Sequence, residues 1–462
     1  MNKRVLIVGG GVAGLTTAYR LLRGDEPPEV TVLEADETPG GKVRSIEVGG
    51  LELEAGPDSL LARKPAAVEL CRELGMAEDL VTPGTGVTYI WSDAGLLRFP
   101  TGPFGISTDM LELWRWPGMS RRGKVRAAAD LVRKPRAEET DESLGSLVRR
   151  RLGDEATETL VAPLLGGLFA GDVDRLSVKA TFPELAAWER MHGSLIRGAR
   201  AASKAARERA VAPMFLRLKG GLRRLTDALA AEIERVRCGA AVDGIRREGA
   251  GYVVRVRELE LAADAVVFAS PAFVTADLME GLAPEAAHEL RAIPYVSTAV
   301  LLLVYPEGTG PELPDSSGFL VPHGKLAMTA CTLVSRKWPD LSFGDRAVVR
   351  CFVGARGVED IVDQPDEDIV DGVSRQLAAV LPLPARPVAA RVVRWPRAMP
   401  QYEAGHLERV ETIERSLPPG AFVAGQAYRG VGVPDCVKGA GDVAERVRSY
   451  LVGEHAEGER IR

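Results

Sequence analysis

The chain has 462 residues, of which 46% are hydrophobic and 27% charged, and its formal net charge at pH 7 is −5. Such a chain is long enough for two or three domains, and its negative charge argues against general nucleic-acid binding. The five cysteines are scattered and form no CxxC pair, which disfavours a disulfide framework and a metal site and fits a reducing compartment. No apolar run of about twenty residues is present, so no membrane-spanning helix is expected. We therefore expect a cytoplasmic protein without a metal centre.

The first forty residues carry the pattern of a dinucleotide-binding α/β unit. An apolar strand at residues 5–8 is followed by a glycine-rich turn, a helix, and a second strand that ends on Glu34. The turn consists of Gly9, Gly10, Gly11, Val12, Ala13 and Gly14. Its first glycine permits the turn, the third lets the backbone approach a pyrophosphate, and the last lets the helix pack closely. Glu34 would accept hydrogen bonds from both ribose hydroxyls. The alternative is a glycine-rich turn in a domain that binds no nucleotide.

The residues after Glu34 indicate FAD rather than NAD. Gly40 and Gly41 would let the backbone approach the pyrophosphate a second time, and Arg44 would place positive charge beside it. This arrangement resembles the extended FAD signature of the amine-oxidase-like flavoproteins. No second GxGxxG follows a strand elsewhere, so a separate pyridine-nucleotide site is not expected. The sequence predicts one non-covalent FAD per chain, with a thioether to Cys436 as the alternative.

Farther along the chain the predicted elements alternate in type. Residues 45–54 and 87–100 are predicted to form hairpins, with a helix at residues 65–74 between them. Residues 105–215 are predicted to be mainly helical, with Thr108 or Asp109 as the cap of one helix and one of Thr140, Asp141, Glu142 and Ser143 as the cap of another. A helix at residues 225–236 and a closing helix from residue 435 are also expected. Further strands are expected near residues 239–246, 252–256 and 265–270, several times within residues 275–400, and at residues 421–425.

The helical region has an aromatic and basic edge. Leu111, Trp114 and Trp116 are followed by a run of basic side chains: Arg121, Arg122, Lys124, Arg126, Arg133, Lys134 and Arg136. An edge of this composition would suit an anionic membrane surface. The simpler interpretation is a solvated helix face. Peripheral contact with the cytoplasmic side of a membrane is therefore an alternative to a protein free of membranes.

Several stretches that lie far apart carry a common pattern. They are residues 56–59 (GPDS), 166–172 (GGLFAGD), 176–177 (LS), 181–183 (TFP), 219–222 (KGGL), 399–402 (MPQY), 405–406 (GH) and 430–436 (GVGVPDC). Together they resemble the oxygen-dependent porphyrinogen oxidases of haem synthesis, from residue 4 to about residue 450. Residues 105–108, 328–332 and 337–339 look like the bacterial branch that acts on coproporphyrinogen III. Members acting on protoporphyrinogen IX often carry an arginine that residues 86–89 (GVTY) lack.

The resemblance implies an α/β fold with a Rossmann-like FAD-binding domain, an inserted helical domain and a mixed α+β substrate domain. The expected boundaries are residues 1–62, 216–272 and 392–455 for the FAD domain, 63–104 and 273–391 for the substrate domain, and 105–215 for the helical domain. The implied FAD contacts beyond the glycine turn and Glu34 are Leu33, Gly41, Lys42, Gly56, Pro57, Asp58, Ser59, Val242, Trp395, Val431, Gly432 and Val433. At the start of the closing helix, Gly430 and Gly432 would let backbone N–H groups approach the flavin edge that becomes negative on reduction.

The implied activity is FAD-dependent oxidation of coproporphyrinogen III to coproporphyrin III in haem biosynthesis, with oxygen as acceptor and hydrogen peroxide as product. One alternative is oxidation of protoporphyrinogen IX. Another is an amine oxidase or a carotenoid desaturase-like enzyme of the same fold. A third is a flavin-bearing scaffold that hands porphyrin to the next haem-synthesis enzyme without turnover.

A porphyrinogen is a large flat macrocycle with propionates, so its site needs an apolar slot and a basic rim. Gly167 and Leu168 fit the slot, since glycine lets the ring approach, and Phe169 would form a wall. The rim candidates share only their positive charge. Lys64 is favoured, because the stretch that carries it also carries implied flavin contacts; the others are Arg336, Lys337, Arg63 and Lys438.

Overall fold

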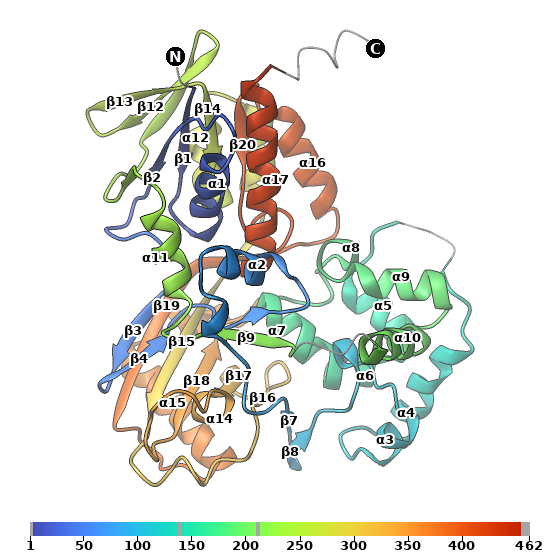
Figure 1. The fold of residues 1–462 in the computed structure, drawn as a ribbon. Coiled ribbons are helices and arrows are strands. Elements are labelled where there is room, and N and C mark those ends of the chain that lie inside the picture. The colour runs from blue at the N-terminus through green and yellow to red at the C-terminus, as the bar shows by residue number, and fades with distance from the viewer. Residues whose placement is uncertain (1–2, 137–139, 209–212, 454–462) are drawn as a thin grey trace.

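The computed structural model describes residues 3–136, 140–208 and 213–453. Its elements form a parallel sheet with its helices, a larger mixed sheet, and a cluster of helices. In Figure 1 the parallel sheet lies at the top, the mixed sheet at the lower left and the helical cluster at the lower right. The three groups meet around α7 (Gly167–Phe169) (Figure 1). The predicted fold class is confirmed.

The parallel sheet takes its five strands from three separate stretches of the chain. In spatial order they are β10 (Val236–Arg237), β2 (Glu29–Leu33), β1 (Arg4–Val8), β14 (Ala265–Phe268) and β20 (Ala421–Val423). β1 pairs in parallel with both β2 and β14, and β14 pairs with β20. β14 is buried along its whole length, as expected for a parallel strand covered on both faces.

Alternate residues of β1 belong to two different cores. Val5 and Ile7 pack on one side and Leu6 and Val8 on the other, because successive side chains of a strand point to opposite faces. The first face is covered by α1 (Val12–Leu22), α2 (Ala66–Glu73), α11 (Arg223–Ala231) and α17 (Val433–Leu451). The second is covered by α12 (Ala272–Met279), α13 (Pro284–Arg291), α16 (His406–Ser416) and the sheet of β11 (Gly244–Glu248), β12 (Gly251–Val256) and β13 (Leu259–Ala263).

The mixed sheet has seven strands. In spatial order they are β19 (Ala389–Pro400), β15 (Tyr295–Val304), β18 (Val348–Val353), β17 (Met328–Leu333), β16 (Gly318–Leu320), β7 (Thr88–Ser92) and β8 (Gly95–Arg98). One face packs on α15 (Asp366–Val380) and the other on the hairpin of β3 (Ser45–Val48) and β4 (Leu51–Glu54).

The expected domain boundary at residue 392 falls inside β19, which is one continuous strand of the mixed sheet. The division into three domains otherwise stays a prediction, and its residues 1–2, 137–139, 209–212 and 454–455 lie outside the described ranges.

The helical cluster is built from short elements. Its α-helices are α3 (Met110–Arg115), α4 (Arg121–Ala128), α5 (Leu144–Leu152), α6 (Asp154–Ala156), α7, α8 (Val178–Thr181), α9 (Pro183–His192) and α10 (Leu195–Glu208), with the tighter turns η2 (Pro103–Gly105) and η3 (Ala129–Leu131). Asp109 caps α3 and Ser143 caps α5 through their side-chain oxygens, and each is one of the candidates that the sequence offered. The short connecting elements are β5 (Leu60–Leu61), η1 (Ala77–Asp79), β6 (Leu80–Val81), β9 (Phe215–Leu218), α14 (Val334–Lys337) and η5 (Glu359–Asp363).

A π-helix, η4 (Thr157–Gly166), leads directly into α7 and was not predicted. It contains Pro163, which has no backbone N–H to donate. Wide helical turns of this kind are rare and occur frequently at functional sites. The segment that follows η4 is therefore a candidate for substrate contacts.

Two element predictions were inaccurate. The helix expected at residues 225–236 is α11, which ends at Ala231. The strand expected at residues 239–246 begins only at Gly244, because Gly239, with a φ of +61°, makes a turn just after β10. Val242 therefore lies in the connection between two strands and not on a strand.

The first part of the aromatic and basic edge lies on α3 and α4, at the rim of the helical cluster (Figure 1), and Arg133, Lys134 and Arg136 follow after η3. Lys124 is buried and does not belong to an exposed edge. Leu111 and Trp114 are exposed there, whereas Trp116 is buried. Among the described residues, no helix has the length and apolar composition needed to cross a bilayer. Contact of this edge with a membrane surface stays a prediction.

Candidate functional site

The glycine turn between β1 and α1 has the geometry that phosphate binding requires. Gly9 has a φ of +108°, and a Cβ on Gly14 would lie 2.0 Å from the Gly9 carbonyl oxygen. A Cβ on Gly11 would instead meet no atom within 4 Å, so the space over this residue is open. Gly9 and Gly14 are thus needed to form the turn, while Gly11 leaves room for a ligand.

A second glycine segment closes against the first. The Gly40 N–H donates to the Gly10 carbonyl oxygen at 2.8 Å, and a Cβ on Gly41 would lie 3.3 Å from the Gly11 Cα. Within the described residues, nothing accepts a hydrogen bond from the N–H of Gly11 or Ala13. These donors stand at the N-terminus of α1, where the helix dipole favours negative charge. They fit the pyrophosphate of FAD.

Glu34 lies immediately after β2, beside this turn, as predicted. Its Oε2 accepts from the Gly10 N–H at 2.6 Å and its Oε1 accepts from the Asp36 N–H at 2.8 Å. A carboxylate has about four acceptor sites, so two ribose hydroxyls can still donate to it. The carboxylate therefore braces the turn and remains able to bind a ribose.

Glu34→Ala is expected to weaken FAD binding by about 1–3 kcal/mol, because it removes the ribose acceptors and both hydrogen bonds that brace the turn. The dissociation constant would rise roughly 5- to 150-fold. Titration of the apoprotein with FAD, followed by fluorescence quenching, measures this change. Glu37→Ala, at an exposed position in the same connection, is the control and should leave the dissociation constant unchanged. Equal affinity of the Glu34 variant and the wild type would remove Glu34 from the site.

The loop that contains Asp58 is held by buried charges. Asp58 Oδ2 lies 2.9 Å from Lys337 Nζ and 3.9 Å from Arg350 Nη1, and Arg350 also donates to the Gly56 carbonyl oxygen. Burial acts to raise the pKa of Asp58, but the two cations hold this pKa well below its usual range. A Cβ on Gly56 would lie 1.7 Å from the Lys42 carbonyl oxygen. The loop is therefore fixed against the second glycine segment.

The N-terminus of α17 presents a second set of unpaired donors. α17 has 19 residues and packs along α1 (Figure 1). In the part of the chain that the structure describes, nothing accepts from the N–H groups of Gly432 and Val433. Gly430 differs, because its N–H donates to the Tyr402 hydroxyl oxygen at 2.8 Å. The hypothesis that the Gly430 N–H faces a flavin is therefore corrected, whereas Gly432 and Val433 fit that role.

Gly167 and Leu168 face outward, as a substrate slot requires. A Cβ on Gly167 would meet no atom within 4 Å, and Leu168 is 55% exposed. Phe169 differs from the prediction of a slot wall. It is only 6% exposed, and its ring packs against Phe182 and Tyr402 at centroid distances of 5.9 and 5.7 Å. Phe169 thus anchors the segment in the helical core, and only its two predecessors are directed outward.

Two of the predicted propionate-binding cations are paired with carboxylates. Lys64 Nζ lies 2.7 and 2.8 Å from the two carboxylate oxygens of Asp435, in the first turn of α17. Lys337 is 12% exposed and bound to Asp58, so it cannot reach a substrate without breaking a buried ion pair. This geometry argues against Lys337 at the rim. Lys64, which is half-exposed, stays a prediction.

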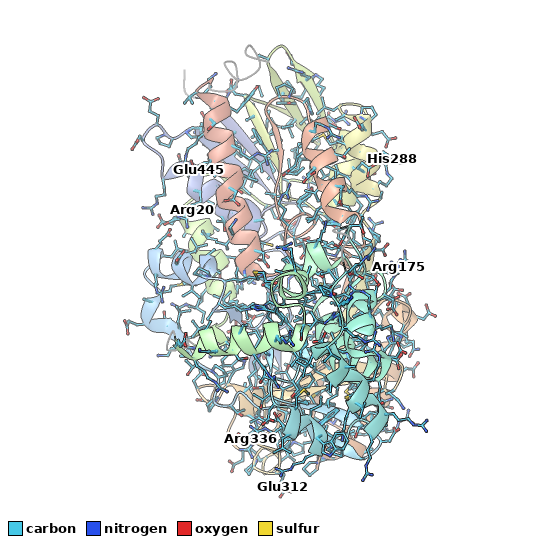
Figure 2. The ribbon with its side chains drawn as sticks, turned by 90° about the vertical axis from the view of Figure 1, so that its right-hand side faces the viewer. Arg20, Arg175, His288, Glu312, Arg336 and Glu445 are labelled. Carbon is cyan, nitrogen blue, oxygen red and sulfur yellow. The ribbon has the colours of Figure 1, made fainter. Side chains whose placement is uncertain are left out.

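Arg336 holds a surface loop. Its guanidinium donates to the carbonyl oxygens of Pro311 and Leu313, and Figure 2 places it at the lower edge of the molecule, beside Glu312. Its donors are thus committed to backbone acceptors and are not directed at an open slot. The structure therefore does not bring Lys64, Arg336 and Lys337 together as one rim.

The two remaining cations of the predicted rim are exposed and make local contacts. The Arg63 guanidinium lies 5.1 Å from the centroid of the Phe104 ring, and Lys438 Nζ lies 3.0 Å from Asp442. Neither contact is buried, so both side chains stay candidates.

Further predicted FAD contacts make bonds within the protein. Lys42 Nζ donates to the Ala398 carbonyl oxygen at 2.8 Å, and burial lowers the pKa of Lys42 to about 8. Trp395 donates from Nε1 to the Ala55 carbonyl oxygen at 3.0 Å, with the Arg44 guanidinium 5.8 Å from its ring centroid. The other members of the predicted set lie in loops or at the ends of elements: Leu33, Pro57, Ser59, Val242 and Val431. All of these FAD contacts stay predictions.

Three residues with a role in the site were not predicted as such. Arg350 lies in β18, and an arginine among alternating residues indicates a solvent-facing position, yet this residue is only 5% exposed. Gln401 and Tyr402 are both buried. The only signal for them in the sequence is their place in the motif at residues 399–402.

Comparison with known proteins decides the family. The family model described as "Flavin containing amine oxidoreductase" matches residues 12–448. The chain belongs to the flavin-containing amine oxidoreductases. A coproporphyrinogen III oxidase of Bacillus subtilis (strain 168) is 33% identical to this oxidoreductase over 466 residues, which covers 97% of this chain and 99% of that protein. The protein of the same name from Mycobacterium tuberculosis (strain ATCC 25618 / H37Rv) is 33% identical, with 96% and 97% covered.

More distant relatives agree with this assignment. Protoporphyrinogen oxidase 1, chloroplastic, of Arabidopsis thaliana is 29% identical to this oxidoreductase, with 96% of this chain and 88% of that protein covered. A crystal structure from Exiguobacterium sp. 255-15 is 32% identical, has a TM-score of 0.87, and is matched over 98% of this chain and 99% of that one. A putrescine oxidase structure, 18% identical with a TM-score of 0.71, covers 97% and 99% and shows the shared fold alone. This oxidoreductase is therefore a flavin enzyme.

Proposed function

We propose that this flavin-containing amine oxidoreductase oxidises coproporphyrinogen III to coproporphyrin III in haem biosynthesis, with oxygen as acceptor and hydrogen peroxide as product. The observation that carries the proposal is the 33% identity, over nearly the whole chain, with coproporphyrinogen III oxidases of Bacillus subtilis and Staphylococcus aureus. The open surface at Gly167 and Leu168 supports it, because a flat macrocycle needs space that no side chain fills.

Bound FAD would supply the two-electron acceptor for removal of hydride from the substrate and would pass the electrons to oxygen. The glycine turn and Glu34 would bind the dinucleotide. The N–H groups of Gly432 and Val433 would stabilise negative charge at the flavin edge, at the positive end of the α17 dipole. We propose one FAD per chain, because the sequence contains one such glycine turn. We propose that it is non-covalent, because Cys436 is buried and burial raises the pKa of its thiol.

The purified protein is expected to be yellow, and acid precipitation should leave FAD in the supernatant. Anaerobic mixing with coproporphyrinogen III should bleach the flavin, and admission of oxygen should restore its colour with formation of hydrogen peroxide.

The four propionates of coproporphyrinogen III carry more negative charge than the two of protoporphyrinogen IX. Positive side chains at the entrance would therefore give coproporphyrinogen III the lower KM, and added salt should narrow the difference. Steady-state rates on both substrates, at low and high salt, measure this preference.

The outcomes separate the alternatives. If the wild type prefers protoporphyrinogen IX, oxidation of protoporphyrinogen IX replaces oxidation of coproporphyrinogen III as the proposed reaction. The similarity to protoporphyrinogen oxidase 1 of Arabidopsis thaliana supports this second candidate. A flavin that stays oxidised with both porphyrinogens would exclude both reactions. Bleaching by an amine would then identify an amine oxidase, and no bleaching by either class of substrate would favour a scaffold that only passes porphyrin on. Lys64→Ala should narrow the copro preference if Lys64 binds a propionate.

A further inference from the structure

Two consecutive side chains just beyond β19 reach two different parts of the site. Gln401 contacts the segment that carries the slot, and Tyr402 contacts the backbone that leads into α17. Both residues are buried, and neither touches the open surface at Gly167. Their position between the slot and the flavin-facing helix suggests a role that the sequence motif alone did not reveal.

Gln401 fixes the segment that follows the slot. Its Nε2 donates to the Phe169 carbonyl oxygen at 2.9 Å and to the Met399 carbonyl oxygen at 3.1 Å. Its Oε1 occupies the other side, where a Cβ on Gly171 would come within 2.5 Å. The amide thus holds the end of α7, two residues after Gly167, and stands directly against Gly171.

Tyr402 fixes the approach to α17. Its hydroxyl donates to the Gln426 carbonyl oxygen at 2.5 Å and accepts from the Gly430 N–H at 2.8 Å. The ring is clamped, since it stacks on His406 with centroids 3.9 Å apart and planes inclined by 12°. Gly430 has a φ of +144°, a conformation that L side chains rarely adopt, and its N–H is one of the two groups that the Tyr402 hydroxyl binds. Two residues later, Gly432 presents the first unpaired donor of α17.

We propose that Gln401 and Tyr402 are a positioning pair, in which Gln401 sets the slot for the macrocycle and Tyr402 sets the backbone donors at the start of α17. The inference rests on the proposed function for the nature of the substrate, but its flavin half does not need a porphyrinogen. Neither residue is a catalytic residue, because each acts through backbone that it holds. Because the pair is adjacent on one strand end, slot and flavin edge are held in fixed relation to each other.

Tyr402→Phe tests the flavin half. The variant keeps the ring stack but leaves the buried Gly430 N–H without its acceptor, so the backbone before Gly432 should relax. With FAD bound, we expect a changed visible spectrum and a lower flavin midpoint potential. We also expect a fall in kcat of about tenfold, which corresponds to about 1.4 kcal/mol, and a KM within about twofold of the wild type.

Gln401→Leu tests the slot half. It should raise the KM for the porphyrinogen, and weaken binding of the porphyrin product, while the flavin spectrum and midpoint potential stay those of the wild type. If Gln401→Leu does not fold, Gly171→Ala provides a second test, because its Cβ would lie 2.5 Å from the Gln401 Oε1 and displace the same amide. This variant should show a smaller rise in the KM for the porphyrinogen, with an unchanged flavin spectrum and midpoint potential. The opposite pattern, a changed potential with unchanged KM, would overturn the assignment of Gln401.

Tyr252→Phe is the matched control. Tyr252 is buried in β12 and its hydroxyl donates to the Pro419 carbonyl oxygen at 2.6 Å, so the same atom is lost from a core that is remote from the slot. This control should lose comparable stability and keep its spectrum, potential and kinetics. If Tyr252→Phe and Tyr402→Phe shift the potential equally, or Tyr402→Phe shifts nothing, the positioning role of Tyr402 is refuted. If the wild type oxidises no porphyrinogen, the proposed function is refuted. The flavin midpoint potential of Tyr402→Phe would still test whether Tyr402 positions the backbone at the start of α17.

Discussion

Gly167→Val should lose most porphyrinogen turnover while its FAD content and thermal stability stay close to those of the wild type. The backbone tolerates a side chain, because Gly167 has φ −58° and ψ −33°, an ordinary helical conformation. The folded protein has space as well, since a Cβ there meets no atom within 4 Å. The valine would therefore occupy only the volume that we propose for the macrocycle. A displacement of about 1 Å can cost about 100-fold in rate, so kcat/KM should fall by at least about that factor.

Gly372→Val is the matched control for this substitution. Gly372 lies within α15, which packs on one face of the mixed sheet, and its Cβ would also meet nothing within 4 Å. The Gly372→Val variant should have the same kcat/KM as the wild type. Gly167→Ala should fall between wild type and Gly167→Val, because its side chain is smaller. If Gly167→Val instead loses FAD or unfolds at lower temperature, Gly167 has a structural role and the slot lies elsewhere.

Asp58→Ala should destabilise the protein by about 3–5 kcal/mol, the cost of leaving buried cations without their partner. Lys337 and Arg350 both lie within 4.0 Å of its carboxylate and are almost completely buried. Because the folded pKa of Asp58 lies below its unfolded value of about 3.9, the carboxylate contributes its full stability above that pH. The contribution is lost as the pH falls from about 4 toward the folded pKa. Urea unfolding of the wild type and variant at pH 7 and at pH 3 measures both effects.

The difference between variant and wild type should therefore shrink at pH 3. Glu260→Ala breaks an exposed pair with Arg246 and should hardly change the free energy of unfolding, because exposed pairs contribute little. Adding Lys337→Met to Asp58→Ala should restore part of the lost stability, since one unpaired cation is removed. A small effect of Asp58→Ala at pH 7 would show that water reaches these cations and that the loop is not fixed as described.

The glycine turn could be predicted from sequence because its determinants are local. The requirement for glycine at Gly14 comes from the carbonyl oxygen of Gly9, five positions earlier, and Gly9 itself has a φ of +108°. Glu34 follows after one helix and one strand. The same is true of the caps at Asp109 and Ser143, where the side chain bonds backbone two or three residues away. For such features the groups that interact are close together in the sequence, so the sequence alone indicates which of them will be in contact.

The partners of charged side chains could not be predicted in this way. Lys337 and Asp58 are separated by 279 positions and meet only because α14 and the loop at Asp58 come together in three dimensions. The sequence around Lys337, with an arginine before it and a tryptophan after it, is equally compatible with an exposed lysine and with a buried one. Gln401 and Phe169 are 232 positions apart, and nothing near either residue indicates the other. The sequence therefore could not indicate which of the predicted rim cations are held by partners within the protein.

The π-helix η4 makes chain length a determinant of the slot. In an α-helix each residue turns the chain by about 100°, and a π-helical turn accommodates an additional residue within the helix. Deleting one residue between Thr157 and Gly166 would change the winding of this segment, and with it the direction in which Gly167 and Leu168 project from its end. The direction in which the slot opens is thus encoded by the count of residues before it. Related chains should vary in composition across this segment far more freely than in length.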